Sequence, residues 1–449
     1  MYALEPGVLF KNINDAIVAE CSVSDIRFPF PALGPGSDAN NAHTTYSNPY
    51  VVLTDSDGHK GVGIGFTLGL GNDHVCRAIQ ELFPLIEGAR LADVVSDFRS
   101  FWRRLANPPQ RRWLGPYSGS CYMAAGALAN AIFDLAAKRE GLPLWKLLVS
   151  LTPEETVRLI DFRYVEHLLT PHEAEAILAD SFAGRHERML AVDAAGLPCY
   201  FTTWIGTDPT SLTRQIGETL SATGIRHYKI KVGVDQAADR AKLAAIRAEF
   251  GGSVTLYVDA NQVWSPPQAV EWMRGLAEYG VTWIEEPTAP DSVDGHRYIR
   301  ERLEPLGIDV VTGENCPNSH LAAHFIASGA VDRFQIDACR VLGPAENMLI
   351  MLIAKKYGIP ICPHAGGSGL DELVPHLSAW NAIALAAGSD SAITEHVALC
   401  SSHFVSPSRV IAGRLQLPGE PGYIVGMTDE AAARFCYPDG SAWASERSP

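Results

Sequence analysis

The sequence predicts an α/β protein in which a (β/α) barrel of the TIM type is covered by an α+β capping domain. Eight short apolar segments alternate with amphipathic helical segments between residues 196 and 403. Polar residues follow these segments at intervals of about one β/α unit. Residues 1–195 lack this alternation, and residues 404–449 are irregular and rich in Gly and Pro. We therefore assign 1–195 to the capping domain, 196–403 to the barrel and 404–449 to a segment that packs on the capping domain.

The composition of the 449-residue chain excludes several classes of protein. Hydrophobic residues make up 47% and charged residues 19%, which is too apolar for a disordered chain. Because 51 acidic residues outnumber 36 basic ones and the net charge is −15, we expect no nucleic-acid or membrane partner. The nine cysteines show no C-x-x-C spacing, and the N-terminus has no basic segment before an apolar one. These features predict a cytoplasmic, globular protein with reduced thiols.

The predicted capping domain mixes strands and helices. Residues 50–53 and 61–65 flank the turn sequence Asp-Ser-Asp-Gly at 55–58, which predicts two paired strands. Helical patterns follow at about 74–105 and 121–138. The stretch 121–133 is apolar but short and rich in Ala and Gly, so it predicts a buried helix rather than a membrane span.

The predicted barrel contains eight strand candidates, at 200–203, 227–232, 255–259, 281–285, 310–313, 333–337, 361–363 and 392–395. The helical segments between them include 235–249, 266–279, 320–328, 346–357 and 370–386. Eight β/α repeats in about 200 residues match the TIM barrel. The structural alternative is a doubly wound open sheet, which would more often show a Gly-rich phosphate loop after its first strand, and the sequence has none there.

Polar residues recur at the C-terminal ends of these strand candidates, where the active sites of such barrels are built. They are Lys229, Lys231, Asp259, Asn261, Glu285, Glu314, Asp337, His364 and Glu395. From Lys231 onward, the residues that represent successive strands are 23 to 31 residues apart. Each interval is about one β/α unit, so we expect these side chains at one level of the barrel mouth.

Three of these residues predict a metal site. Asp259, Glu285 and Glu314 follow three consecutive strands, and three converging carboxylates repel one another unless a hard cation lies between them. Ligands that offer only oxygen suit Mg²⁺. The alternative is three separate acids that cap helices at strand-to-helix turns. Their common register favours the metal.

Lys229 and Lys231 are two residues apart on one strand, so both side chains share a face and reach one site. Repulsion and partial burial each lower a lysine pKa, which would let Lys231 act as a base near neutral pH. The alternative is a pair of surface lysines on an edge strand.

Asp337 and His364 follow adjacent strand candidates. A carboxylate beside an imidazole orients the ring and raises its pKa, which suits a general acid or base. Cys316, Cys339 and Cys362 lie nearby in the sequence, but a nucleophilic thiol would have His364 as its only candidate base. The combined set instead suits removal of the proton α to a metal-bound carboxylate, with the enediolate stabilised by cations.

The motifs also resemble the enolase superfamily, mandelate-racemase subgroup, and within it the L-fuconate and closely similar L-galactonate dehydratases. The barrel motifs are Tyr-Lys-Ile-Lys-Val (228–232), Val-Asp-Ala-Asn-Gln-Val-Trp (258–264), Trp-Ile-Glu-Glu-Pro (283–287), Thr-Gly-Glu (312–314), Gln-Ile-Asp (335–337) and Pro-His (363–364). Further resembling segments are 25–29, 36–39, 112–116, 160–164, 364–367 and 437–440. Together they run through nearly the whole chain.

The resemblance implies a modified, enolase-type barrel and a Mg²⁺-dependent dehydratase, a lyase that converts a sugar acid to a 2-keto-3-deoxy sugar acid. It implies Lys231 as the base, His364 paired with Asp337 as the acid, and Mg²⁺ on the three carboxylates. Lys229 and Asn261 would contact the substrate carboxylate or enediolate, and Glu395 would support the intermediate's oxygen. Asp38 and Tyr46 would reach the sugar hydroxyls from the capping domain. We expect a homo-oligomer whose partner is this small-molecule substrate.

The sequence departs from the family pattern at 317–319, 342–344 and 398–401, and the loop 202–208 is shorter than usual. These segments line or flank the expected pocket, so L-galactonate or another aldonate is an alternative to L-fuconate. A racemase or epimerase that uses Lys231 and His364 as opposed bases is a second alternative. A non-catalytic paralogue that binds sugar acids is a third.

Overall fold

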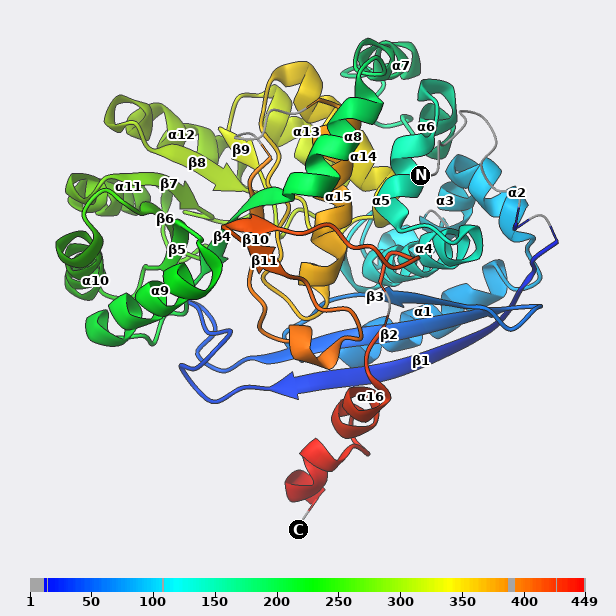
Figure 1. Cartoon of the computed structure of the whole chain (residues 1–449), viewed down its shortest axis with the longest axis horizontal. Helices are drawn as coiled ribbons and strands as arrows, with labels where there is room; N and C mark the ends of the chain where they lie inside the picture. The colour runs from blue at the N-terminus through cyan, green and yellow to red at the C-terminus, as the bar shows by residue number, and fades with distance from the viewer. Residues whose placement is uncertain (1–11, 14, 107–108, 387–391, 425, 448–449) are drawn as a thin grey trace.

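The computed structural model describes residues 12–13, 15–106, 109–386, 392–424 and 426–447, and Figure 1 shows their arrangement. An antiparallel sheet in the order β1-β2-β3 lies on one side of the molecule. Its strands are Val18–Pro29, Thr45–Asp55 and Lys60–Ile64. The strand predicted at 50–53 lies within β2, and the one predicted at 61–65 corresponds to β3, which ends one residue earlier. β1 was not predicted, because most of its side chains are polar or half-buried and give no clear apolar alternation.

Helix α4 (Gly119–Glu140) packs on this sheet and is almost completely buried. Two glycines of β3 allow the close approach, because a Cβ atom at Gly61 or Gly63 would collide with the helix backbone at Ala131 or Ala127. By length and composition alone α4 would pass for a membrane span, but 89% of its most apolar window is buried inside the protein. The prediction of a buried helix is confirmed.

The helical pattern predicted at about 74–105 corresponds to three α-helices rather than one continuous helix. They are α1 (Asn72–Leu82), α2 (Leu91–Ser96) and α3 (Phe98–Ala106). Pro84 cannot continue a helix with a normal hydrogen bond, and Gly88 has a positive φ of 75°. Both residues lie between α1 and α2 and end the first helical run.

The predicted barrel is confirmed. Six strands pair in parallel in the order β4-β5-β6-β7-β8-β9, and β10 pairs in parallel with β4. Their bounds are Leu197–Thr202, His227–Lys231, Thr255–Asp259, Val281–Glu285, Asp309–Thr312, Arg333–Phe334 and Thr394–His396. The strand predicted at 361–363 is reduced to one parallel bridge between Ile361 and Phe334. The eight predicted positions therefore comprise seven strands and one bridge.

Seven helices follow the barrel strands and surround them in Figure 1. They are α9 (Pro209–Thr223), α10 (Gln236–Phe250), α11 (Pro266–Leu276), α12 (Val293–Leu303), α13 (Ser319–Ala327), α14 (Gly343–Tyr357) and α15 (Leu370–Ala384). Asp208 and Asp235 cap α9 and α10 by accepting hydrogen bonds from backbone N–H groups of the first turns. One apolar core lies between β4–β8 and α9–α12, and a second joins α14 and α15 to α4 and the β1–β3 sheet.

Helices of the N-terminal part also contact the barrel. Helices α5, α6, α7 and α8 are Leu144–Ser150, Pro153–Leu159, Pro171–Asp180 and Arg185–Ala195. Helices α5 and α8 pack on α15, and α7 packs on α14. Helices α5, α7 and α8 thus lie against the outer helices of the barrel, whereas α6 packs on α7, α2 and α3. The boundary after residue 195 stays a prediction.

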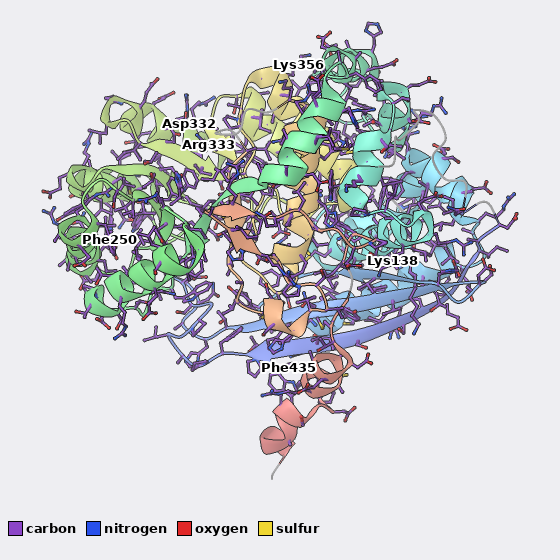
Figure 2. The ribbon with its side chains drawn as sticks, in the orientation of Figure 1. Lys138, Phe250, Asp332, Arg333, Lys356 and Phe435 are labelled. Atoms are coloured by element: carbon purple, nitrogen blue, oxygen red, sulfur yellow. The ribbon has the colours of Figure 1, made fainter. Side chains whose placement is uncertain are left out.

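The C-terminal segment divides its contacts between the two parts of the molecule. Strands β11 (Val410–Ile411) and β12 (Arg414–Leu415) form a hairpin, and β12 pairs antiparallel with β4 of the barrel. Helix α16 (Asp429–Phe435) packs on β1 and ends at Phe435, which Figure 2 labels. The ring centroids of Phe435 and Phe28 lie 4.7 Å apart. The hairpin therefore adjoins the barrel, whereas α16 adjoins the capping sheet.

Candidate active site

The predicted residues gather at the C-terminal ends of the barrel strands, around a cavity of about 170 Å³. Lys229, Lys231, Asn261, Glu314, His364 and Glu395 line it from the barrel, and Asp38 and Tyr46 line it from the capping domain. The strand register explains the convergence, because Lys231 lies beside Asp259 and Asp259 lies beside Glu285 in adjacent parallel strands. The three predicted residues that do not line the cavity, Asp259, Glu285 and Asp337, are buried.

Asp259, Glu285 and Glu314 each offer a carboxylate oxygen, and these atoms all lie within 4.8 Å of one another. Burial raises the pKa of Glu285 well above its ordinary value, and Lys229 only partly opposes the shift. Gln335 donates a 2.7 Å hydrogen bond to Glu285 and so fixes the direction of that carboxylate. A set of three converging oxygen ligands, two of them buried, fits a hard divalent cation.

The two lysines reach the carboxylates as their spacing predicted. Lys231 Nζ lies 2.6 Å from Asp259 Oδ2 and 2.9 Å from Asn261 Oδ1. Lys229 Nζ lies 2.6 Å from Glu285 Oε1 and 2.8 Å from Glu395 Oε1. The expected fall in the Lys231 pKa is not found. Burial is the largest single effect and lowers this pKa, as does repulsion from Lys229, but the carboxylates of Asp259, Glu314 and Asp38 together raise the pKa above its usual range.

His364 lies between two carboxylates. Its Nδ1 atom is 2.8 Å from Asp337 Oδ2, and its Nε2 atom is 3.2 Å from Glu314 Oε2. Burial lowers the pKa of His364, but Glu314 and Asp337 together raise it to about 10. The backbone N–H of Cys339 donates a 2.6 Å hydrogen bond to Asp337 and holds it under the ring. His364 is therefore protonated at neutral pH, as a general acid requires.

Glu395 closes the polar ring at the last strand. Its Oε2 atom accepts a 2.8 Å hydrogen bond from the backbone N–H of Ala365, and its Oε1 atom accepts one from the hydroxyl of Thr202. Burial alone would raise the pKa of Glu395, but Lys229 and His364 lower it to about 2. The carboxylate is ionised and aimed at Lys229.

The capping domain covers the cavity with a loop whose conformation is fixed by its own polar groups. The Asp38 carboxylate accepts hydrogen bonds from the backbone N–H groups of Asn40 and Asn41. The side-chain amide of Asn40 donates to the backbone carbonyl of Asn261, which ties the loop to the barrel. Tyr46 is buried, with its ring packed edge-to-face against Phe66. Both predicted capping residues thus line the cavity.

Sequence reasoning missed several residues of the site. Glu286 is buried and accepts hydrogen bonds from Gln262 (2.7 Å) and Asn315 (3.0 Å). Burial, with a smaller contribution from Glu314, raises the pKa of Glu286 to about 8. Its φ of 43° is unusual for a non-glycine residue. Glu286 does not line the cavity, but Gln262 and Asn315, which donate to it, do. Arg340 also lines the cavity, and no sequence signal identified it.

The three neighbouring cysteines do not support a thiol mechanism. Cys316, Cys339 and Cys362 are buried, and none lines the cavity. Burial raises the pKa values of Cys316 and Cys362 to about 12. These thiols are protonated at neutral pH.

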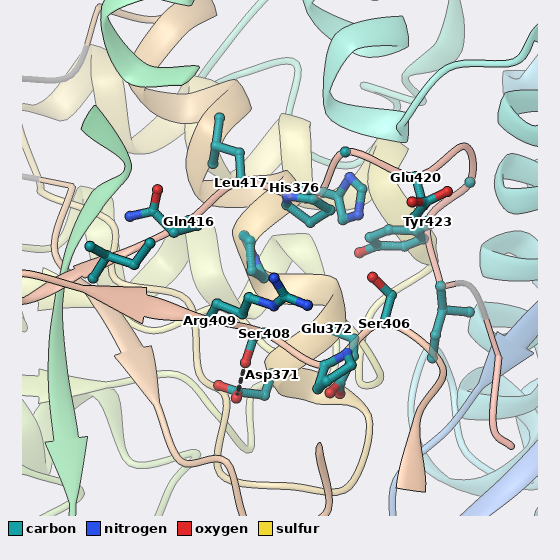
Figure 3. Close-up of a pocket in the computed structure, with 17 residues that line it drawn as sticks. Asp371, Glu372, His376, Ser406, Ser408, Arg409, Gln416, Leu417, Glu420 and Tyr423 are labelled. Atoms are coloured by element: carbon teal, nitrogen blue, oxygen red, sulfur yellow. Dashed lines mark hydrogen bonds between the residues drawn. The ribbon is translucent and has the colours of Figure 1, made fainter. Parts of the chain in front are cut away.

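A larger cavity of about 360 Å³ lies elsewhere, between α15 and residues 406–424 (Figure 3). Its lining includes Asp371, His376 and Arg409. None of the predicted site residues lines it. The clustered carboxylates, lysines and histidine mark the smaller cavity as the candidate active site.

Two family models match the chain. Residues 36–149 match the mandelate racemase / muconate lactonizing enzyme N-terminal domain, and residues 211–431 match the enolase C-terminal domain-like family. The L-galactonate dehydratase of Hypocrea jecorina is 42% identical over 427 residues, which cover 93% of this chain and 94% of that protein. The chain belongs to the enolase superfamily. The resemblance inferred from the motifs is confirmed, as is the enolase-type barrel with its capping domain.

Solved structures of enolase superfamily proteins agree with this assignment. Human mitochondrial enolase superfamily member 1 has a TM-score of 0.95 and 40% identity, with 97% of this chain and 100% of that chain covered. An L-talarate/galactarate dehydratase from Salmonella typhimurium, solved with Mg and L-lyxarohydroxamate, has a TM-score of 0.73 and 23% identity, with 96% and 95% covered. The second likeness shows the fold.

Proposed function

We propose that this protein is a Mg²⁺-dependent sugar-acid dehydratase that converts an aldonate to a 2-keto-3-deoxy sugar acid. The observation that carries the proposal is the placement of a lysine pair and a histidine–aspartate pair around one set of three carboxylates. The lyase class is further supported by the extensive similarity to a protein named L-galactonate dehydratase.

Asp259, Glu285 and Glu314 hold Mg²⁺ in this proposal. When bound, the ion supplies positive charge that orients the substrate carboxylate and stabilises the enediolate. The three side chains fit this role because Asp259 and Glu285 are buried, Glu314 is partly buried at the cavity, and all three offer oxygen atoms that lie within 4.8 Å of one another.

Lys231 removes the proton from C2 in its neutral form. The Asp259 carboxylate has two roles in this proposal, because it contacts the Lys231 ammonium group and raises its pKa, and it also binds Mg²⁺. Lys229, held between Glu285 and Glu395, contacts the substrate carboxylate and balances the charge that develops on it. Asn261 contacts the same group.

His364 donates a proton to the departing hydroxyl at C3. Asp337 keeps the ring oriented, and the raised pKa keeps it protonated until the hydroxyl leaves. Glu395 supports the oxygen of the intermediate. Asp38 and Tyr46 contact the sugar hydroxyls, because both line the cavity from the capping side.

We propose L-fuconate or a similar aldonate as the substrate, with L-galactonate as the alternative. The test is a screen of hexonates, 6-deoxyhexonates and pentonates with Mg²⁺ for formation of 2-keto acids. Turnover of one aldonate that stops after addition of a chelator supports the proposal. Absence of any 2-keto acid across the panel would contradict it.

A racemase or epimerase is the second candidate, because Lys231 and His364 line one cavity. Proton NMR of each reaction separates the two activities. Formation of an epimer without loss of water would replace the dehydratase proposal with a racemase.

A further inference from the structure

The last strand of the barrel has few backbone contacts to hold it. Strand β10 is only three residues long, and among the described residues it pairs with β4 alone. It nevertheless carries Glu395, whose carboxylate contacts Lys229 at 2.8 Å. A short strand paired on one side needs other contacts to fix the direction of its side chains.

The side chain of Asp371, in the first turn of α15, provides such contacts. Its carboxylate accepts hydrogen bonds from His396, the last residue of β10, and from four groups of the segment that follows. The donors are the imidazole of His396 (3.1 Å), the backbone N–H groups of Val397 (3.2 Å) and Ala398 (3.3 Å), and the hydroxyls of Ser401 (3.2 Å) and Ser408. Asp371 is 3% exposed, and Figure 3 shows its bond to Ser408.

His396 connects this cluster to the active site. Successive side chains of a strand point to opposite faces, so Glu395 points into the barrel and His396 points outward, toward α15. The register of β10 places His396 beside Phe201, and the two rings lie 6.5 Å apart. Asp371 and Phe201 thus fix the outward side chain, and the peptide that joins it to Glu395 transmits that constraint.

We propose that Asp371 is a positioning residue that holds Glu395 against Lys229 by anchoring His396 and the loop after it. The expected effect of Asp371 on turnover rests on the proposed function. The expected effect of Asp371 on the position of Glu395 does not depend on any substrate. The backbone of the anchored loop supports the idea, because Ala398 has a positive φ of 55° and still donates to Asp371.

The test replaces Asp371 with Asn, which keeps the size of the side chain and removes its charge and part of its accepting capacity. We expect a crystal structure of D371N to show Glu395 withdrawn from Lys229. With the aldonate that the wild type dehydrates, we expect kcat to fall about 10- to 100-fold and KM to change less than about twofold. We expect kcat to fall more than KM changes because Glu395 supports the intermediate rather than the bound substrate.

Asp134→Asn is a matched control. Asp134 is also fully buried and accepts backbone hydrogen bonds from Val62, Tyr423 and Ile424, but it lies on α4, away from the cavity. We expect D134N to lower thermal stability and to leave kcat within about twofold. If D371N lowers stability but leaves both kcat and the position of Glu395 unchanged, Asp371 is a structural residue and the proposal is overturned.

A second variant tests the route through His396 and replaces D371N if that protein does not fold. His396→Gln should reduce kcat in the same direction, and the double variant should lose little more than the worse single variant. Fully additive losses would mean that the two side chains act separately and would overturn the proposal. If the wild type dehydrates no aldonate, the proposed function fails, and the crystal structure of either variant still decides whether Glu395 is displaced.

Discussion

The two halves of the barrel hold their functional groups by different means. In the half that carries the lysines and the metal ligands, β5, β6 and β7 each have five residues. β5 pairs with β6 in unbroken parallel register, and β6 pairs with β7 in parallel with one irregularity between Leu256 and Tyr257. In the half that carries His364 and Glu395, β9 has two residues, Ile361 makes one bridge and β10 has three residues. Side-chain hydrogen bonds replace the missing backbone ladder there.

A substitution should act differently in the two halves. In the regular half, the position of each functional group follows from strand register, so a substitution of the group itself removes its chemistry and little else. In the irregular half, groups outside the cavity hold the functional side chains, as Cys339 N–H holds Asp337 and Ala365 N–H holds Glu395. Substitutions in that half should therefore change geometry and chemistry together.

The largest effect is expected in the regular half, for Lys231→Ala. Loss of the base should reduce both dehydration and exchange of the C2 proton with solvent by about 10³-fold or more. Exchange is measured by NMR in ²H₂O, and the melting temperature should change little because Lys231 lies at the cavity. Retention of C2 exchange in K231A would show that another group removes the proton.

The next prediction concerns the irregular half and separates the two steps. His364→Asn should reduce dehydration by about 10³-fold while C2 exchange stays within about tenfold of the wild type, because Lys231 is intact. Both rates are measured on the same sample by NMR. An equal loss of both rates would mean that His364 takes part in proton removal, contrary to the proposed division of roles.

A smaller effect, on the affinity for Mg²⁺, is expected when a metal ligand is replaced. Glu314 has the most exposed side chain of the three carboxylates, at 14%, so its replacement should disturb folding least. Glu314→Gln should weaken Mg²⁺ binding by about 100-fold, as measured by isothermal titration calorimetry. A chelator should abolish wild-type activity, and added Mg²⁺ should restore it. Unchanged affinity in E314Q would remove Glu314 from the ligand set.

The smallest expected effect is on the pH dependence of the unfolding free energy. It arises where α15 packs on α5, behind the irregular half. His376 accepts a hydrogen bond from the backbone N–H of Trp145, and burial lowers its pKa from 6.5 to about 3. The unfolded chain binds a proton at this site below about pH 6.5, whereas the folded protein does not until about pH 3. The stability contribution is therefore fully present above pH 6.5 and is lost as the pH falls toward 3.

We expect this histidine to account for about 2 kcal/mol of unfolding free energy lost between pH 7 and pH 5. Urea unfolding at several pH values measures the loss. His376→Gln should flatten the pH dependence over this interval, even if it lowers stability at pH 7. An unchanged slope in H376Q would show that other groups cause the acid sensitivity.

The sequence alone determined the barrel and most of the candidate site. The barrel follows from the alternation of apolar strands with helices, which is a local pattern. Residues at the ends of parallel strands converge by geometry, so the sequence also predicts that the lysines, the three carboxylates and the Asp337–His364 pair lie together. Their residue types then fixed the kind of chemistry they can perform. The sugar remains a proposal, because the lining of the cavity depends on loops whose sequences follow no period.

Only the tertiary structure decided the features that depend on contacts between distant segments. The Lys231 pKa rises because the carboxylates of Asp259, Glu314 and Asp38 together outweigh burial and the repulsion from Lys229, and sequence spacing cannot weigh those effects. Glu286, with a positive φ, lies beside the site through hydrogen bonds to Gln262 and Asn315. Asp371 anchors His396 and the loop after it, 25 or more residues further along the chain. Periodicity reports which face a residue occupies, whereas electrostatic balance and anchoring depend on which side chains the fold brings together.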